Sequence, residues 1–158
     1  MQIREFNEAT DRDGLCECVI SIQDYERALD PRMLSGETIV EAYVAEIFEE
    51  CRRYQGKILV ADVEGVIAGY VLLHSHVTSE SLEDGNMAFG LIRDLVVLDR
   101  FRGQRIGGSL LEAAENLAKK GGVKCLRIEV LSSNENAREI YLAKGFKPYT
   151  QMLEKSLE

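Results

Sequence analysis

The sequence lacks most features that would mark it as something other than an ordinary globular domain. It has two prolines, no low-complexity tract and no internal repeat, which argues against collagen-like, solenoid and largely disordered chains. Its longest apolar run, about eight residues from Val66, is far shorter than the roughly 20 that a membrane helix needs. The first ten residues lack the apolar core of a signal peptide. We therefore expect a cytoplasmic protein, without a membrane partner, that forms a single domain over residues 1–158.

Metal-ligand patterns are also missing. The two histidines, His74 and His76, are far in sequence from the four cysteines, and no two cysteines form a CxxC pair. A structural zinc site needs closer ligand spacing than this. We expect no metal and four ordinary reduced thiols, as is usual in the cytoplasm.

Charge is distributed unevenly along the chain, whose net charge is -8. Residues 1–50 contain 13 acidic and 4 basic residues, whereas residues 51–158 contain 14 acidic and 15 basic residues. The acidic first third argues against nucleic acid as a partner. It is typical of solvated helix faces, and it would also suit an entrance that attracts a cationic partner.

The hydrophobic spacing predicts one mixed α/β sheet with helices packed on its faces. We expect a strand at 2–6, helices over 10–29 and 40–51, strands at 57–63, 66–76 and 87–98, a helix over 109–120, a strand at 123–131, a helix over 132–144 and a last strand at 147–157. Glu64 and Gly65 predict a hairpin turn, and residues 77–86 a polar loop. Capping boxes at Thr10 and Ser132 predict the starts of two of the helices.

The stretch DRFRGQRIGG, residues 99–108, places three arginines and three glycines directly before the third predicted helix. The start of a helix offers unpaired backbone N–H groups and the positive end of the helix dipole. Glycine lets that backbone approach an anion closely, and Arg102 and Arg105 add full positive charges. Together these features predict a phosphate-binding site.

The spacing within this stretch argues against the two commonest phosphate motifs. Gly103, Gly107 and Gly108 do not fit GxGxxG, and Ser109 stands where a Walker A loop needs its lysine. Without that lysine, a grip on the outer phosphates of a triphosphate is poorly supported. A diphosphate held mainly by backbone amides remains.

Three segments then resemble one family, the Gcn5-related N-acetyltransferases (GNAT). Residues 100–118 resemble the family's acetyl-CoA loop and helix, whose pattern is Arg/Gln-x-x-Gly-x-Gly/Ala, with Arg105 in place of the first motif glycine. Residues 91–97 look like the preceding family strand. Residues 126–146 are similar to a family pattern that is met here by Asn134, Ala137, Tyr141, Gly145 and Phe146. The motifs together cover roughly residues 57–148.

The resemblance implies a GNAT-like fold, which is a mixed, mostly antiparallel central sheet flanked by helices in the order β-α-α-β-β-β-α-β-α-β, with a splayed strand that binds acetyl-CoA. It implies one N-acetyltransferase domain that transfers an acetyl group from acetyl-CoA to a primary amine by direct attack in a ternary complex. The implied cofactor contacts are Leu95, Val96, Val97, Arg102, Gly103, Gln104, Arg105, Ile106, Gly107, Gly108, Ser109 and Asn134. Family members often dimerise, so a homodimer is also compatible with the resemblance.

The same resemblance suggests the residues that move protons. It gives Tyr141 the role of the acid that protonates the departing CoA thiolate. As proton acceptor it points to Glu129, although Glu129 could instead pair with Arg127 two residues away. Other members carry a glutamate base where this chain has Arg93. The neighbouring Asp94 would face the opposite side of the sheet unless a bulge redirects it, and a water chain is a further alternative.

The acceptor is predicted only as a class. Family members shape the acceptor site with their amino-terminal helices and the loop between them, and here that region holds the acidic excess. This favours a cationic acceptor, such as a polyamine, an aminoglycoside-like amine or a protein amino group. Two other functions stay open, a catalytically silent acyl-CoA-binding module and a nucleotide-diphosphate binder unrelated to acyl transfer.

Overall fold

The computed structural model describes residues 1–79 and 82–157. Its elements are β1 (Gln2–Glu5), α1 (Glu8–Leu29), α2 (Gly36–Arg53), β2 (Lys57–Val63), β3 (Val66–Thr78), β4 (Ala88–Val97), α3 (Ile106–Lys120), β5 (Leu126–Ile128) and α4 (Glu135–Ala143), with short 3-10 turns at Leu82–Asp84 and Asp99–Phe101. The strands form one sheet in the order β1-β2-β3-β4-β5. Neighbouring strands are antiparallel except β4 and β5, which are parallel. Within the described ranges, no helix has the length and apolar character needed to cross a membrane.

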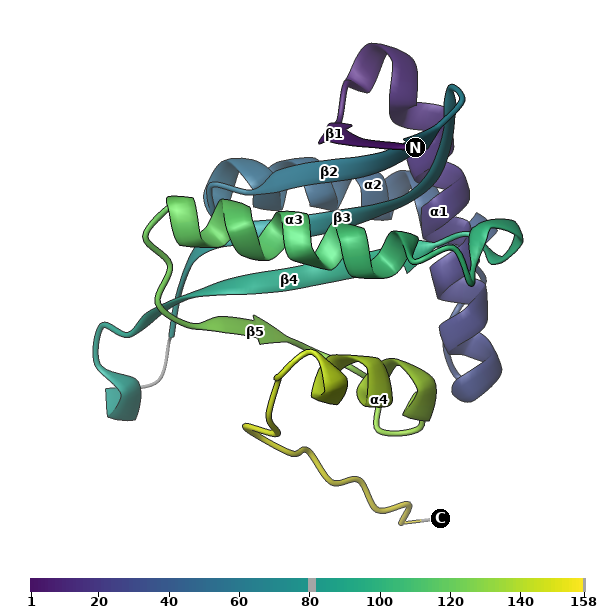
Figure 1. Ribbon diagram of the computed structural model, residues 1–158. Coiled ribbons are helices and arrows are strands. Elements are labelled where there is room, and N and C mark those ends of the chain that lie inside the picture. Colours follow the sequence, from purple (N-terminus) through teal and green to yellow (C-terminus); the bar gives the residue numbers. More distant parts are fainter. Residues whose placement is uncertain (80–81, 158) are drawn as a thin grey trace.

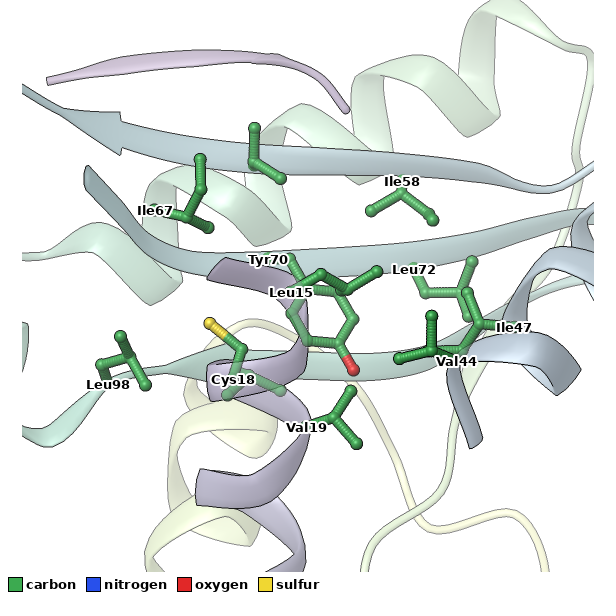
Figure 2. Close-up of a cluster of buried hydrophobic side chains, with 12 residues drawn as sticks. Leu15, Cys18, Val19, Val44, Ile47, Ile58, Ile67, Tyr70, Leu72 and Leu98 are labelled. Atoms are coloured by element: carbon green, nitrogen blue, oxygen red, sulfur yellow. The ribbon is translucent and has the colours of Figure 1, made fainter. Parts of the chain in front are cut away.

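Helices cover both faces of this sheet (Figure 1). On one face, α1 and α2 bury a cluster that includes Leu15, Val19, Val44, Ile47, Tyr70 and Leu72, and Figure 2 shows the Tyr70 ring extending from β3 into it. On the other face, α3 buries a second cluster that includes Val71, Leu73, Ile92, Ile106, Leu110 and Leu111. The predicted mixed, mostly antiparallel sheet flanked by helices is confirmed.

The hairpin between β2 and β3 is confirmed at the predicted residues. Glu64 and Gly65 form the turn, with φ angles of 55° and 84°. Two successive positive φ angles are typical of the tight turns whose twist matches that of paired strands. The polar connection predicted over 77–86 includes residues 80 and 81, which lie outside the described ranges.

Two helix starts were predicted wrongly. Helix α1 begins before Thr10, because Asn7 is the N-cap and its side chain accepts from the Ala9 N–H at 3.0 Å. Helix α4 begins after Ser132, because Asn134 is the N-cap and accepts from the Ala137 N–H at 3.1 Å. Asparagine caps helices better than threonine, which favours Asn7 over Thr10. Asparagine and serine cap equally well, but Asn134 is also held by the Tyr25 hydroxyl, which donates to its Oδ1 at 3.3 Å.

The predicted last strand is also wrong. Residues 147–157 form neither helix nor strand, and their side chains are exposed. The strand predicted over 123–131 is reduced to the three residues of β5, which leaves only a short edge on which another strand could pair. In addition, Met152 and Leu153 are adjacent apolar residues, which breaks the alternation of a half-buried strand. As a result, α4 and the carboxyl-terminal segment lie beyond the β5 edge of the sheet (Figure 1).

Candidate active site

Strands β4 and β5 diverge and leave one edge of β4 open. They are paired through Gly90, Leu91 and Ile92 of β4 only. Beyond Ile92 the strand borders a cleft of about 2880 Å³, which is also lined by α1, the loop before α3, and α4. Backbone N–H and C=O groups that lack a strand partner can pair with an extended ligand. The splay that the family resemblance implied is therefore present in the fold.

The cleft brings together most of the residues that the sequence singled out. Among the described residues, all predicted cofactor and catalytic positions line it except Gln104 and Ser109. Leu95 and Val97 are half-buried, whereas the Val96 side chain is buried with α1 and α2 on the opposite face of the sheet. The Val96 carbonyl also faces β3, where a Cβ added to Gly69 would meet it at 2.2 Å, so Val96 presents neither this group nor its side chain to the cleft.

The loop before α3 has the backbone that a phosphate site needs. Gly103 and Arg105 have φ angles of 77° and 62°, and Arg105 is the N-cap of α3. The left-handed conformation costs a non-glycine residue about 1 kcal/mol, so Arg105 is strained at the position where the family pattern has glycine. Ile106, only 2% exposed, anchors the loop in the core beneath α3.

The two glycines at the start of α3 are not required by the protein's own packing. A Cβ added to Gly107 would meet its nearest atom, Val97 Cγ2, at 3.5 Å, and one on Gly108 would meet Lys144 Nζ at 3.9 Å. Both are ordinary van der Waals distances. Packing within the protein therefore explains neither glycine, and a diphosphate fits the unpaired N–H donors at this helix start. Ser109 lies one step further on, and its hydroxyl donates to the Arg105 carbonyl at 3.3 Å.

A β-bulge in β4 reverses the faces to which its side chains point on either side of Arg93. Leu72 of β3 pairs with Asp94, but the adjacent Leu73 pairs with Ile92, so Arg93 is an extra residue. Ile92 faces the core beneath α3, whereas Asp94 contacts Tyr70 on the opposite face. The bulge that Asp94 needed in order to be redirected is therefore present.

Asp94 is held between two tyrosines and is 6% exposed. The hydroxyl groups of Tyr43 and Tyr70 donate to its two oxygens at 2.9 Å and 2.8 Å. Burial raises the pKa of Asp94, and the Arg93 charge and both tyrosines oppose that shift. The Arg93 guanidinium in turn donates to the Tyr43 oxygen at 2.9 Å and lies 3.5 Å from Glu50. The Asp94 carboxylate therefore has a fixed orientation and is largely shielded from solvent.

Two further titratable groups lie within electrostatic reach of Asp94. Burial and the Asp94 charge both raise the pKa of Glu26, which projects from α1. Burial, followed by the charges of Glu26 and Asp94, raises the pKa of Tyr141 on α4 to about 12. All three residues line the cleft. The acidic amino-terminal third, β4 and α4 thus contribute one group each to a single electrostatic cluster.

Glu129 lies in a different setting. It follows the end of β5, is exposed, and lines the same cleft. The Arg127 guanidinium carbon lies 3.9 Å and 4.3 Å from the ring centroids of Phe89 and Tyr149. Across the described part of the chain, no ion pair joins Arg127 to Glu129. The alternative that Glu129 serves as the ionic partner of Arg127 is therefore wrong.

Asn134 is 9% exposed and connects α4 to α1. Besides capping α4, its Oδ1 accepts a hydrogen bond from the Tyr25 hydroxyl at 3.3 Å. Four further site residues were not predicted from the sequence, namely Tyr25, Glu26, Tyr43 and Tyr70. A signal was present for the tyrosines, because a phenol on a predicted buried face needs a hydrogen-bond partner, but it does not say which one.

Comparisons with known proteins agree with this geometry. The model of the acetyltransferase (GNAT) family matches residues 22–146. The uncharacterized N-acetyltransferase YhfO of Bacillus subtilis is 31% identical over 108 residues, which cover 67% of this chain and 70% of that protein. The aminoalkylphosphonate N-acetyltransferase of Salmonella typhimurium is 26% identical over 153 residues, which cover 93% of this chain and 87% of that protein.

A solved structure shows the same fold over the whole length. The structure of a tetramutant of the BH1408 protein from Bacillus halodurans superposes with a TM-score of 0.80, covering 99% of this chain and 100% of that one at 24% identity. Acetyltransferases with this fold use acetyl-CoA. Among the described residues, no group of three or more metal-ligating side chains gathers. The chain belongs to the acetyltransferase (GNAT) family and is an acyltransferase.

Proposed function

We propose that residues 1–158 form one N-acetyltransferase domain, which transfers the acetyl group of acetyl-CoA to a cationic primary amine by direct attack in a ternary complex. One observation carries this proposal. A single cleft runs along the open edge of β4 from a cationic, glycine-containing helix start to the buried Asp94 and the half-buried Glu26. The first end suits the diphosphate of CoA and the second suits an ammonium group.

On the cofactor side, the backbone at the start of α3 would bind the diphosphate. Arg102 and Arg105 add charge there, and Gly107 and Gly108 leave room for close approach. The pantetheine arm would pair with the backbone groups of Leu95–Val97 that face away from β3, where Arg102 Nε donates to the Val97 carbonyl at 3.3 Å. The remaining proposed contacts are Gly103, Gln104, Ile106 and Ser109 in or beside the loop, and Asn134 across the cleft.

On the acceptor side, negative charge is in excess. Four carboxylates interact with the Arg93 guanidinium, and they belong to Glu26, Glu46, Glu50 and Asp94. An ammonium group between Glu26 and Asp94 would reduce their mutual repulsion, so it should bind favourably. The relative from Salmonella typhimurium acts, by its name, on amines that carry a phosphonate. The acidic cluster favours polycationic acceptors over such anionic ones in this protein.

The transfer requires two proton movements. An alkylammonium with a pKa near 10.4 must lose a proton before its nitrogen can attack the thioester carbon. As the C–N bond forms and the C–S bond breaks, the CoA thiolate takes a proton, so the products are an amide, CoA thiol and one released proton. The resemblance points to Glu129 as the base. The burial of Asp94 within the cluster supports Asp94 as the competing candidate.

Tyr141 is the proposed acid. Its raised pKa, about 12, keeps the phenol protonated across the working pH range. Two of the causes of that shift are the negative charges of Glu26 and Asp94. A bound ammonium would offset these charges and lower the pKa of Tyr141 toward that of the thiolate, which is near 8.5. Proton donation would therefore become easier once the acceptor is bound.

A thiol-release assay over amines and peptides tests the proposal. We expect acceptor-dependent CoA release from acetyl-CoA, and turnover about 100-fold lower in Tyr141→Phe, the range typical of losing a general acid. Tyr54→Phe is the matched control, because Tyr54 lies outside the cleft and stacks on His74 with ring centroids 5.2 Å apart. Binding of acetyl-CoA without acceptor-dependent release would indicate a silent acyl-CoA module. A larger thermal shift with ADP than with CoA would indicate a nucleotide-diphosphate binder.

A further inference from the structure

Tyr25 lies where three separate parts of the cleft meet. Its hydroxyl donates to Asn134 Oδ1 at 3.3 Å, and the Arg102 guanidinium carbon lies 5.3 Å from the centroid of its ring. Tyr25 belongs to α1, Arg102 to the loop before α3, and Asn134 to the start of α4. One side chain thus contacts both walls of the cleft.

The contact to Asn134 matters because α4 has few restraints of its own. None of the residues of α4 is fully buried, so a core of its own does not fix its position. Asn134 Oδ1 accepts one bond from the Ala137 N–H, at 3.1 Å, and the other from Tyr25. Both acceptor sites of Oδ1 are then used, so the Nδ2 group is the part of the side chain that can donate to a ligand.

The contact to Arg102 matters because the loop before α3 is exposed. The Arg102 guanidinium pairs with Asp99 at 2.8 Å, and its Nε donates to the Val97 carbonyl at 3.3 Å. These two contacts are made by residues close to Arg102 in the sequence, whereas the Tyr25 ring approaches from α1 across the cleft. A guanidinium over a tyrosine face is stabilised by the negative potential of the ring. The charge is thereby held beside the open end of β4.

We propose that Tyr25 is a positioning residue of the acetyl-CoA site, with its ring orienting Arg102 toward the diphosphate and its hydroxyl orienting Asn134 toward the pantetheine arm. This inference rests on the proposed function, because it assumes that both partners contact acetyl-CoA. It predicts that the two halves of the Tyr25 side chain serve two different parts of one ligand.

Two substitutions separate these halves. Tyr25→Phe keeps the ring and removes the hydroxyl, so it should weaken CoA and pantetheine binding equally, by about threefold. Tyr25→Leu removes both, so it should weaken CoA binding roughly tenfold but pantetheine binding still only about threefold, because pantetheine lacks the diphosphate. Calorimetry measures the CoA affinity, an NMR titration measures the pantetheine affinity, and thermal unfolding without ligand checks that each variant is folded.

Tyr54→Leu is the matched control. It removes a comparable arginine–tyrosine contact, Arg53 at 5.1 Å from the ring centroid, at a position outside the cleft, and should change neither affinity. CoA affinity in Tyr25→Leu equal to or tighter than that of the wild type would overturn the inference. So would equal losses for CoA and pantetheine in that variant. If the wild-type protein binds no CoA, the proposed function itself fails, and this result is distinct from a failure at Tyr25.

Discussion

The two ends of the open β4 edge are built in opposite ways. At the bulge, Asp94 is buried and both of its oxygens accept hydrogen bonds from tyrosines. Arg93 in turn donates a hydrogen bond to one of them, Tyr43. At the loop before α3, the backbone is strained at Arg105, and the side chains of Arg102, Gln104 and Arg105 are exposed. A buried, fully hydrogen-bonded group suits proton transfer, where orientation decides the rate. An exposed backbone with room above it suits ligand binding. Changes at the bulge should therefore act on turnover, and changes at the loop on the KM for acetyl-CoA.

The largest effect is expected at the bulge end. If Asp94 is the base, Asp94→Asn lowers kcat/KM by at least about 100-fold, whereas Glu129→Gln lowers it severalfold at most. The pH profile adds a second readout. The pKa of Asp94 is raised, so the active, ionised form is lost as the pH falls through a value above the usual 3.9, and the wild-type acid limb lies there. The Asn variant should lose that limb. A larger loss in Glu129→Gln would instead identify Glu129 as the base.

The next effect is expected at the loop end. Gly107→Ala should raise the KM for acetyl-CoA roughly 30-fold, because its Cβ occupies the space that the diphosphate needs. The free energy of unfolding should stay unchanged or rise by about 0.5–1 kcal/mol, because alanine favours a helix more than glycine does. The added Cβ causes no clash, since its nearest atom, Val97 Cγ2, would lie 3.5 Å away. Steady-state kinetics and thermal unfolding together test this pair of outcomes. A drop in stability with unchanged KM would mean that Gly107 serves packing.

A smaller effect is expected across the cleft from the bulge. Glu26→Gln should raise the KM for a diamine acceptor about tenfold, and less for a monoamine, because only the diamine keeps a second ammonium that can pair with Glu26 after its reacting nitrogen loses a proton. The rise in KM for the diamine should become more similar to that for the monoamine at high salt, because salt screens the charge interaction. Glu41→Gln on α2 is the control, since Glu41 is exposed and does not line the cleft. Equal losses for both amines would argue against a role in charge recognition.

The same comparison explains what the sequence could predict. The loop end was predictable because its signal is local, with Arg102, Gly103 and Gly107 within one short stretch before a helix. The bulge end was not, because the direction of Asp94 depends on how β4 pairs with β3, and one extra residue reverses it. Glu26 and Tyr25 enter the site only because α1 crosses the cleft. Spacing along α1 shows which residues share a face but not what that face meets.

The smallest effect is expected at Arg105, and it separates charge from backbone at the loop end. Arg105→Gly removes a positive charge near the proposed diphosphate site, so the KM for acetyl-CoA should rise about threefold with kcat unchanged. Its φ of 62° suits glycine, but glycine also gains more freedom in the unfolded chain, so stability should change by less than about 1 kcal/mol. Arg105→Lys keeps the charge and should retain the wild-type KM. Because Arg105 is exposed, the KM difference between the glycine variant and the wild type should fade at high salt. A salt-independent loss, or a fall in kcat, would mean that the arginine acts through the shape of the loop and not through its charge.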